Sequence, residues 1–319
     1  MALIKNFTAG EEISTYLLIK SSEIKQTRGT PPKDYLDIIL ADQSGEISAK
    51  LWDASSVDKE SFTALQVAHV KGIVQPYKEK LQFKIDHIRK VTKEEGVSIA
   101  QFIRSAPIPP EQLMQIIQHA ASSIQEPMFH QIVKFCMDKT ADKLSSHPAA
   151  KTIHHAFYGG LAYHIVRMLE VAEFLVKQRP FLHADLLIAG IILHDIAKTE
   201  ELDASQGVVN DYSITGKLLG HISIASNWIV EAAVSFGFSF SDERIIALQH
   251  MILAHHNKGE YGSPVQPQLP EAVALHYIDL IDSRMQAVED AMDSLSPQSN
   301  WTPQVRAAEN MSMYKMKWT

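Results

Sequence analysis

Imidazole and carboxylate side chains recur inside apolar segments of this 319-residue sequence. Residues 190–198 read GIILHDIAK, so His194 and Asp195 stand side by side in an otherwise apolar run. A buried, unpaired carboxylate is costly enough that it is usually neutralised, paired with a cation or bound to a metal. The pattern therefore predicts partners for Asp195, and neighbouring helices have to supply them.

Further residues of these two types occupy positions where the apolar pattern expects burial. The set comprises His164, His194, Asp195, His221, His255, His256 and Asp279. These residues come from five helical segments, and leaving them unpaired in one core would cost more than a marginally stable domain can bear. Cys136 is the only cysteine, so no intrachain disulfide can form and a metal has to be held by His, Asp and Glu. We interpret the set as a metal site.

Five other histidines after residue 96 are interpreted as core residues rather than ligands. A single histidine on an apolar helix face is more often a hydrogen-bonded core residue than a ligand. We interpret the following residues in that way: His119, His130, His147, His183 and His250. The doublet at positions 154 and 155 precedes the glycines at 159 and 160, where a helix is expected to begin. We expect this doublet to be structural, with a contact to the ligands or to substrate as the alternative.

The hydrophobic period changes from strand-like to helical along the chain. Segments with partial alternation, rich in β-branched and aromatic residues, occupy 14–24, 34–45, 46–54, 64–77 and 81–91. Five such strands predict a small all-β barrel over residues 1–92, followed by a linker over 93–110. Apolar residues then recur at helical spacing in 111–124, 129–144, 160–178, 184–198, 221–237, 242–256 and 270–292. Residues 111–319 are therefore predicted to form an all-α domain with a C-terminal tail.

Composition limits the class of protein. The sequence is 45% hydrophobic and 21% charged, which is ordinary for globular domains. No apolar stretch reaches the roughly 18 to 20 residues of a membrane span, and the first residues lack the features of a secretory signal. We expect a cytoplasmic protein with no membrane partner. The formal net charge of -7 does not favour nucleic-acid binding, although a local basic groove stays compatible with it.

The order H…HD…H…HH…D on successive helices resembles the HD-domain metal-dependent phosphohydrolase superfamily, in the version that binds two metals. This resemblance spans residues 157–284. It implies that one metal is held by His164, His194, Asp195 and Asp279. It also implies that the second is held by His221, His255 and His256, with Asp195 bridging the two. A bridging role suits an aspartate because each of its two oxygens can take one ion.

The whole chain is similar to the YhaM-type 3′-to-5′ exoribonuclease family. The motifs that carry this resemblance are QSGEISAKLWDA in the barrel and GGLAYH, ILHDIAK, LGHI, AHHNKGEYGSP and LHYIDLIDSRM in the helices. The resemblance implies an N-terminal OB fold, an all-α HD domain and manganese-dependent removal of nucleotides from single strands. Two small departures, Ala197 and Asn257, stand where relatives often have glycine, and neither replaces a ligand.

Several residues around the expected site could contact a nucleic acid. Lys198, in HDIAK, could bind a phosphate oxygen, or it could be a solvent-facing lysine at a helix end. The loop after the His doublet offers Lys258 for phosphate and Tyr261 for base stacking, and loop 205–212 is a second candidate wall of the pocket. In the barrel the candidates are Trp52, Tyr77, Lys78 and Lys80. Strand alternation predicts that Trp52 and Phe83 are buried and that Tyr77, Lys78 and Lys80 are exposed.

These observations lead to one function and two alternatives. The first hypothesis is a hydrolase that degrades single-stranded RNA, and also single-stranded DNA as a further substrate, from the 3′ end to nucleoside 5′-monophosphates. Two divalent ions would activate water, with Mn²⁺ preferred and Fe²⁺ compatible with the same ligands. The alternatives are an HD hydrolase of a small nucleotide and a single-strand binding protein with structural metals. Aromatic and methionine residues in the C-terminal tail could dock on a neighbouring subunit, and the barrel could also serve as an assembly surface. We therefore expect a homo-oligomer.

Overall fold

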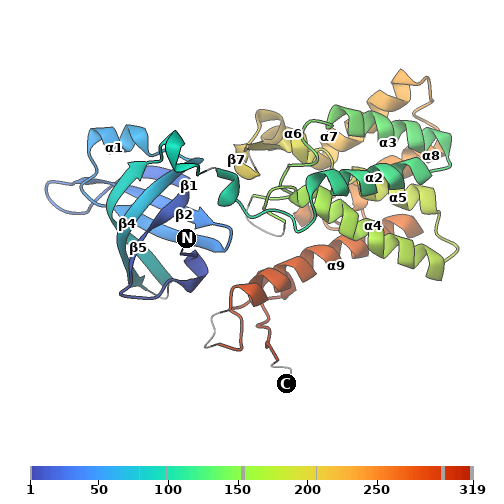
Figure 1. Cartoon of the computed structure of the whole chain (residues 1–319). Coiled ribbons are helices and arrows are strands. Elements are labelled where there is room, and N and C mark those ends of the chain that lie inside the picture. The colour runs from blue at the N-terminus through green and yellow to red at the C-terminus, as the bar shows by residue number, and fades with distance from the viewer. Residues whose placement is uncertain are drawn as a thin grey trace. The chain divides into compact units, whose positions relative to one another are not determined.

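The computed structural model describes residues 2–78, 80–97, 99–151, 155–205, 207–295 and 299–316. The chain divides into two compact units, which are described separately below (Figure 1). The first unit comprises Met1–Arg104 and Ser294–Asn300, and the second comprises Ser105–Asp293 and Trp301–Thr319. The first is built on a β-barrel and the second on helices, so the predicted fold class is confirmed.

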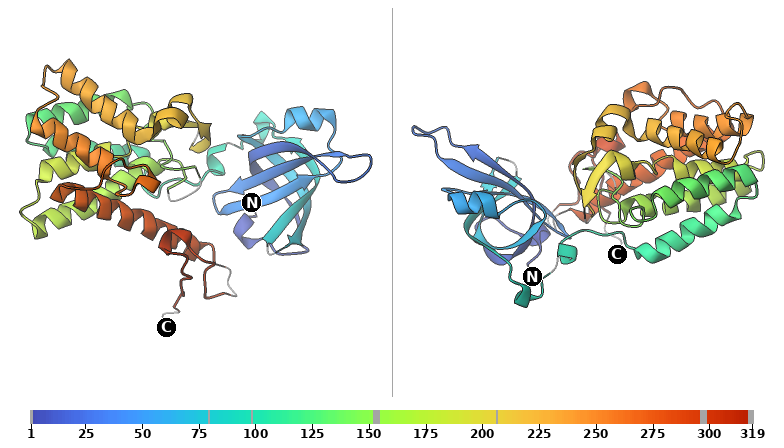
Figure 2. Two further views of the ribbon diagram at one scale, coloured as in Figure 1. Left: turned by 180° about the vertical axis from the view of Figure 1, so that it is seen from behind. Right: turned by 90° about the horizontal axis from the view of Figure 1, so that it is seen from above.

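Five strands close the first unit into a barrel with the order β1-β2-β3-β5-β4. Figure 2 shows the ribbon of this unit from behind and from above. They are β1 (Glu12–Gln26), β2 (Asp34–Asp42), β3 (Gly45–Leu51), β4 (Gln66–Tyr77) and β5 (Lys80–Lys90), with helix α1 (Ser56–Ser61) between β3 and β4. β1 pairs with β4 through its first half and with β2 through its second half. A register shift between Ile19 and Ser21 bends β1 between these two partners. A five-stranded barrel with this strand order is an OB fold.

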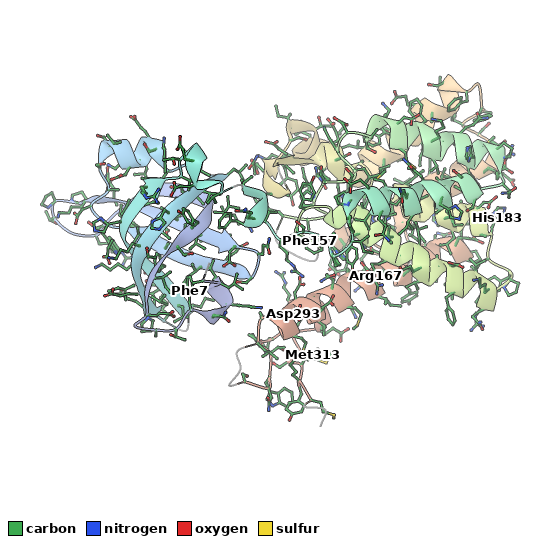
Figure 3. All side chains as sticks on the ribbon, in the orientation of Figure 1. Phe7, Phe157, Arg167, His183, Asp293 and Met313 are labelled. Carbon is green, nitrogen blue, oxygen red and sulfur yellow. The ribbon has the colours of Figure 1, made fainter. Side chains whose placement is uncertain are left out.

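The barrel interior is apolar, and two aromatic side chains test the prediction made from strand alternation. Phe83 is fully buried, as predicted. Phe7, which Figure 3 labels in the barrel, belongs to the same core cluster. The expectation that Trp52 is buried is wrong, because this side chain is 42% exposed. Trp52 follows the last residue of β3, so the alternation of that strand no longer sets its direction. Its ring instead lies 4.7 Å from the ring of Tyr35.

The second unit contains eight helices among the described residues. They are α2 (Pro110–Ser123), α3 (Pro127–Lys139), α4 (Gly160–Gln178), α5 (Ala184–Leu193), α6 (Lys198–Glu201), α7 (Ile214–Ser235), α8 (Glu243–Ala254) and α9 (Pro270–Asp293). Short 3₁₀ helices lie at Gly259–Tyr261 and Arg306–Ala308 in this unit, and at Ile4–Asn6, Lys93–Glu95 and Ile99–Gln101 in the first unit. Helix α5 is apolar on all sides and packs against α2, α3, α4, α8 and α9. A helix that is hydrophobic all round has to be buried, so α5 forms the centre of the bundle.

The chain departs from the predicted helices at three points. Helix α5 ends at Leu193, and the chain makes a turn before α6 begins at Lys198. The expected loop over 205–212 is instead part of a hairpin of β6 (Leu202–Ser205) and β7 (Val208–Tyr212). Helix α7 begins before Gly220 and is kinked there. Among the described residues, no helix combines the length with the apolar character that a membrane span requires.

Candidate metal centre and nucleic-acid groove

The helical unit brings all seven predicted metal-site residues into one cluster. Potential ligand atoms lie within 4.8 Å of one another in two sets that meet around Asp195. One set is Asp195, His221, His255 and His256, and the other is His164, His194 and Asp279. The residues come from five places: helix α4, the turn that follows α5, helix α7, the residues directly after α8, and helix α9. The convergence therefore depends on how these helices pack around α5.

The two carboxylate oxygens of Asp195 face different histidines. Oδ1 lies 3.3 Å from Nε2 of His221 and 3.8 Å from Nε2 of His255. Oδ2 lies 3.4 Å from Nε2 of His194 and 3.9 Å from Nε2 of His164. Asp195 thus stands between the two sets, and each oxygen belongs to one of them.

Five imidazoles present the same nitrogen to this cluster because their other nitrogen has an oxygen partner. Nδ1 of His194, His255 and His256 lies 2.7 to 2.8 Å from a backbone carbonyl oxygen. Nδ1 of His164 and His221 lies 2.6 and 3.0 Å from a carboxylate oxygen. If Nδ1–H donates in each of these contacts, the lone pair of each imidazole is on Nε2, the nitrogen that faces the cluster.

Helix ends position two of these histidines. His194 follows α5 and His255 follows α8 directly. Each lies near the carbonyl oxygen three residues earlier, that of Ile191 and that of Ile252. These carbonyls belong to the last turn of a helix, where no helical N–H group is left to bond them. The imidazole therefore satisfies a helix end and is oriented by it.

A kink in α7 positions His221. Gly220 has φ 71°, a left-handed value that favours glycine, and His221 is the next residue. Oε1 of Glu201 accepts a hydrogen bond from the backbone N–H of His221 at 3.2 Å. Oε2 of the same carboxylate lies 3.0 Å from Nδ1 of the imidazole. Sequence reasoning did not single out Glu201, because it assigned the segment before it to a continuous helix.

Asp282 is a further residue of the site, and the sequence analysis did not single it out. Oδ2 of Asp282 lies 2.6 Å from Nδ1 of His164 and 2.6 Å from Nε2 of His155. Asp282 follows Asp279 by three residues on α9, so both face α4, and this spacing was the available signal. His155 is fully buried and contacts a ligand-orienting carboxylate, which corresponds to the alternative considered for the doublet. His154 lies outside the described residues.

The backbone around His155 approaches α4 closely. A Cβ atom on Gly160 would lie 2.0 Å from the carbonyl oxygen of His155, so only glycine permits this approach. Because Gly160 opens α4 and His164 lies one turn further along, the glycine brings His155 and His164 to the same carboxylate. The glycine pair that predicted a helix start thus also permits the packing of the site.

Lys198 lies inside the cluster rather than on its surface. Its Nζ is 2.6 Å from Oδ2 of Asp195, and its side chain is largely buried. The interpretation as a solvent-facing lysine at a helix end is therefore wrong: Lys198 begins α6 and pairs with the central carboxylate. Burial alone would lower the pKa of Lys198, but Asp195 raises it above the usual value.

The pKa values of the surrounding groups reflect this crowding of charges. Burial alone would raise the pKa of Asp195 and that of Asp279, but neighbouring cationic groups hold both below the usual range. Burial alone would lower the pKa of His164, but its interactions with Asp279 and Asp282 raise it to about 10. Burial lowers the pKa of His255 and that of His256. The carboxylates are thus ionised at neutral pH and attract a cation.

The residues of the cluster fit a divalent metal ion. Oδ1 of Asp195, Nε2 of His221 and Nε2 of His255 are buried, and none has a hydrogen-bond partner among the described residues. A buried polar atom without a partner costs about 1–3 kcal/mol, so three such atoms at one point need an explanation. Imidazole nitrogens and carboxylate oxygens are ordinary ligands of divalent transition metals. A divalent cation bound here would satisfy all three atoms.

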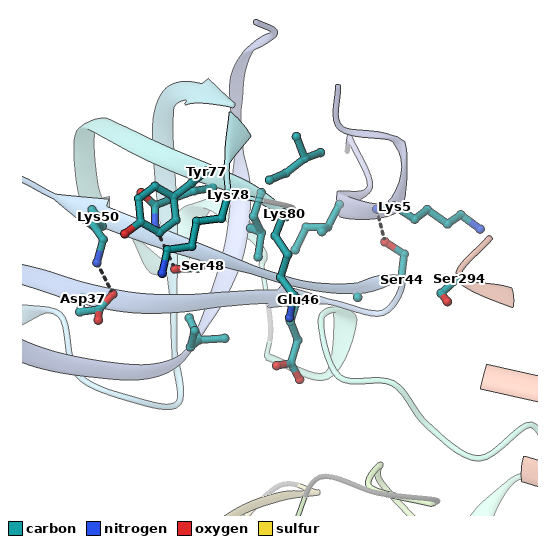
Figure 4. A pocket seen from close by; sticks show the side chains of 16 residues that line it. Lys5, Asp37, Ser44, Glu46, Ser48, Lys50, Tyr77, Lys78, Lys80 and Ser294 are labelled. Atoms are coloured by element: carbon teal, nitrogen blue, oxygen red, sulfur yellow. Dashed lines mark hydrogen bonds and ion pairs between the residues drawn. The ribbon is translucent and has the colours of Figure 1, made fainter. Parts of the chain in front are cut away.

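The first unit carries a separate groove on the barrel surface, with a volume of about 1070 Å³ (Figure 4). Four lysines line it: Lys5, Lys50, Lys78 and Lys80. Tyr77 also lines it and is 53% exposed, which agrees with the expectation for Tyr77. The groove runs over β2, β3 and the turn between β4 and β5, which is the face that OB folds use for oligonucleotides. Trp52 is not among the described lining residues.

The loop after the His doublet contains the last two predicted contact residues. Lys258 and Tyr261 are both exposed, and Nζ of Lys258 lies 5.7 Å from the centre of the Tyr261 ring. The carbonyl oxygen of Tyr261 lies 2.7 Å from Nδ1 of His256. This contact connects the loop directly to the cluster. The exposed ammonium of Lys258 and the exposed ring of Tyr261 therefore belong to a loop that is held by a predicted metal ligand.

Comparisons with known proteins agree with this arrangement. The model of the HD domain matches residues 161–284. A protein of Bacillus pumilus named 3′-5′ exoribonuclease YhaM is 40% identical over 314 residues, covering 98% of this chain and 97% of the relative. The chain belongs to the YhaM family of 3′-5′ exoribonucleases. The YhaM protein of Bacillus subtilis is also 40% identical, over 96% of this chain and 95% of that protein.

Solved structures give a weaker likeness than these YhaM relatives. The second OB-fold domain of replication protein A from Methanococcus maripaludis covers 28% of this chain and 93% of its own, with 16% identity and a TM-score of 0.25. The family assignment therefore rests on the YhaM sequences. It makes the protein a hydrolytic enzyme whose HD domain binds divalent metal.

Metal affinity should rise with pH. Without metal, His164 carries a proton below its pKa of about 10, and a metal at Nε2 has to displace that proton. His255 and His256 have lowered pKa values and do not compete in this way near neutral pH. We expect the Kd for Mn²⁺, measured by isothermal titration calorimetry, to fall about tenfold from pH 6.5 to 7.5. A Kd that stays constant over this range would contradict the assigned charge of His164.

Proposed function

We propose that the protein is a metal-dependent 3′-to-5′ exonuclease that degrades single-stranded RNA to nucleoside 5′-monophosphates. The observation that carries this proposal is the cluster itself. Nε2 atoms of four histidines lie 3.3 to 3.8 Å from Asp195 or Asp279, and His256 belongs to the same cluster. The chain is 40% identical, over 98% of its length, to a relative named 3′-5′ exoribonuclease YhaM. Single-stranded DNA is the further substrate that the same assays would test.

In this proposal the two sets of residues hold two divalent ions. His164, His194 and Asp279 hold one, which we call site A. His221, His255 and His256 hold the other, called site B. Asp195 contributes one oxygen to each, because its two oxygens face different sets. When bound, such a pair of ions polarises the phosphodiester and lowers the pKa of water enough to supply hydroxide at neutral pH.

We propose Mn²⁺ as the metal, with Fe²⁺ as the alternative. The ligand set is mixed, with imidazole nitrogens and carboxylate oxygens and no thiolate, and both ions accept it. Cys136 is buried in the helical core, away from these ligands, and burial raises the pKa of its thiol to about 12. Sulfur ligation therefore does not favour zinc here.

Lys198 has a role in this proposal beyond its ion pair. Its ammonium contacts the same oxygen of Asp195 that faces site A, so a cation in site A competes with it for that oxygen. We propose that the displaced ammonium binds a non-bridging phosphate oxygen of the substrate. The side chain is already ordered at the cluster, so little rearrangement is needed.

The groove of the barrel supports a single-stranded substrate. OB folds bind single strands by stacking bases on aromatic rings in a basic groove. Tyr77 supplies a ring, and Lys78 and Lys80 supply cations next to it. We propose that these residues, with Trp52, Lys258 and Tyr261 as further contacts, bind the strand whose 3′ end is hydrolysed.

Replacing Asp195 with Asn should abolish hydrolysis, because the amide supplies only one ligand oxygen and no charge. The assay follows 5′-labelled oligoribonucleotide with Mn²⁺, and the wild type should give a ladder that shortens from the 3′ end. We expect the variant to lose at least about a thousandfold in rate and to keep its affinity for the strand. Turnover of small nucleotides alone, or binding without cleavage by the wild type, would contradict the proposal. Full activity of the variant would contradict the site.

Replacing Tyr77 and Lys78 with Ala should weaken binding of long strands selectively. Loss of one stacked base costs about 1–3 kcal/mol, so we expect KM for a 20-nucleotide RNA to rise at least about tenfold. The kcat on a dinucleotide should stay unchanged. Lys90→Ala is the matched control, because this exposed lysine lies in the same unit and is absent from the described lining of the groove. Equal effects of the control and the double variant would contradict the role of the groove.

We also propose that copies of the chain associate through the outward face of α9. Four apolar side chains at every fourth position are each 42% to 59% exposed: Val273, Tyr277, Ile281 and Met285. The outward line of a surface helix is normally polar. If two α9 helices pair antiparallel about a two-fold axis, exposed Glu289 and Asp293 of each face the N-terminal turn of the other. The helix dipole favours negative charge at that end, so the face complements itself.

Replacing Ile281 with Lys should dissociate this assembly, because a charge would enter the apolar contact. Light scattering after size-exclusion chromatography should show an oligomer for the wild type and a monomer for the variant. Phe174→Lys is the control, since Phe174 is also exposed, at 66% against 52% for Ile281, but lies on α4. A monomeric wild type, or dissociation by the control as well, would contradict this surface.

A further inference from the structure

The cluster contains two carboxylates that do not belong to either set of ligand atoms around Asp195. Asp282 lies behind His164 and Glu201 lies behind His221, each near Nδ1 of an imidazole whose Nε2 faces the cluster. Both carboxylates are nearly nine-tenths buried. A buried carboxylate is costly, so a backbone carbonyl would be the simpler acceptor if orientation alone were needed.

Backbone carbonyls do serve the three other histidines. Nδ1 of His194, His255 and His256 each lies near a carbonyl oxygen at 2.7 to 2.8 Å. One histidine in site A and one in site B thus differ from the rest by having a carboxylate partner. A carboxylate fixes the imidazole as a carbonyl does, and its charge also makes the imidazole a stronger ligand.

Asp282 holds His164 together with Asp279 of the same helix. Nδ1 of His164 lies 2.6 Å from Asp282, and Nε2 lies 3.3 Å from Asp279. His155, which lies 2.6 Å from the same oxygen of Asp282, braces the carboxylate from the other side. The spacing of His155, His164 and Asp282 would also admit an ion. Because both imidazoles lie at direct hydrogen-bond distance from one oxygen of Asp282, we assign this trio as an orienting chain.

Glu201 holds His221 in a different way. It contacts both the backbone N–H and Nδ1 of His221, directly after the kink at Gly220. The carbonyl oxygen of Glu201 accepts a hydrogen bond from the backbone N–H of Ser213 at 2.9 Å. A Cβ atom on Gly216 would lie 2.2 Å from that oxygen, so α6 and α7 cross closely at this point. Glu201 therefore fixes the kink and the imidazole at once.

We propose that Asp282 and Glu201 are positioning residues, each of which sets the metal affinity of one site: Asp282 for site A through His164, and Glu201 for site B through His221. This proposal rests on the proposed function, because it takes the two sets as metal sites. Neither carboxylate is a ligand in this proposal. Each sets the affinity of one ion through the histidine that it holds.

The test is calorimetric titration of the full-length protein with Mn²⁺. Asp282→Asn and Glu201→Gln keep the size of the side chain and one acceptor oxygen, remove the charge, and replace the second oxygen by an NH2 group. Because both oxygens of Glu201 contact His221, Glu201→Gln also loses one of these two hydrogen bonds. Each should weaken one of two Mn²⁺ equivalents about 10- to 100-fold and leave the other within about twofold. Glu173→Gln and Glu200→Gln are the controls, since Glu173 is exposed on α4, the helix of His164, and Glu200 is exposed on α6, the helix of Glu201; they should change neither affinity.

A ligand variant assigns each effect to a site. In the background of His221→Ala, Glu201→Gln should cause no further loss, because its partner is gone, whereas Asp282→Asn should still weaken the remaining equivalent. A merely structural role would lower both affinities in every background. Two Mn²⁺ equivalents in the wild type that neither amide variant alters would overturn this inference and leave the proposed function intact. No Mn²⁺ binding by the wild type would overturn the proposed function itself.

A second pair of variants tests the proposal if an amide variant does not fold. Asp282→Glu and Glu201→Asp keep the charge and shift the carboxylate by one methylene. We expect each to weaken its own site about 3- to 30-fold, as checked by the same titration with thermal unfolding in EDTA as the measure of folding. Unchanged affinities in folded variants would again overturn the inference.

Discussion

The burial of one carboxylate at the end of the central helix is the constraint around which the helical unit is built. Helix α5 is apolar on every side, so it has to lie in the middle of the bundle, and Asp195 follows it there. An isolated charge at that depth costs several kcal/mol. Lys198 offsets part of this cost, and imidazoles from α4, α7 and the end of α8 lie around the carboxylate. The arrangement leaves three buried polar atoms without a hydrogen-bond partner among the described residues, and a bound divalent cation would satisfy them.

The same constraint explains how much of the site the sequence predicts. A polar residue inside an apolar helical run is visible without a structure, and every residue of the seven-member set lies in such a run or at its end. Asp282 was not predicted because an acidic residue near the middle of a long, partly exposed helix is typical of a solvated face. Glu201 was not predicted because periodicity shows neither the turn after α5 nor the kink at Gly220 that brings α6 to α7.

The barrel shows a related limit. Alternation correctly predicts five strands and the burial of Phe83, because both depend on local pattern. It fails for Trp52, since the strand ends one residue earlier and a turn sets the direction of the ring. Net charge is an equally indirect guide. The sequence carries -7 overall, yet four lysines line one groove of the barrel, because pairing and folding decide where charges gather.

The central claim is that Asp195 separates two divalent ions held by the surrounding histidines. Crystals of the protein grown with Mn²⁺ test it most directly, through anomalous scattering measured above and below the manganese absorption edge. The account predicts two anomalous peaks about 3.5–4 Å apart, one on each side of the Asp195 carboxylate. A single peak bound by one set of histidines, or peaks elsewhere in the molecule, would contradict it.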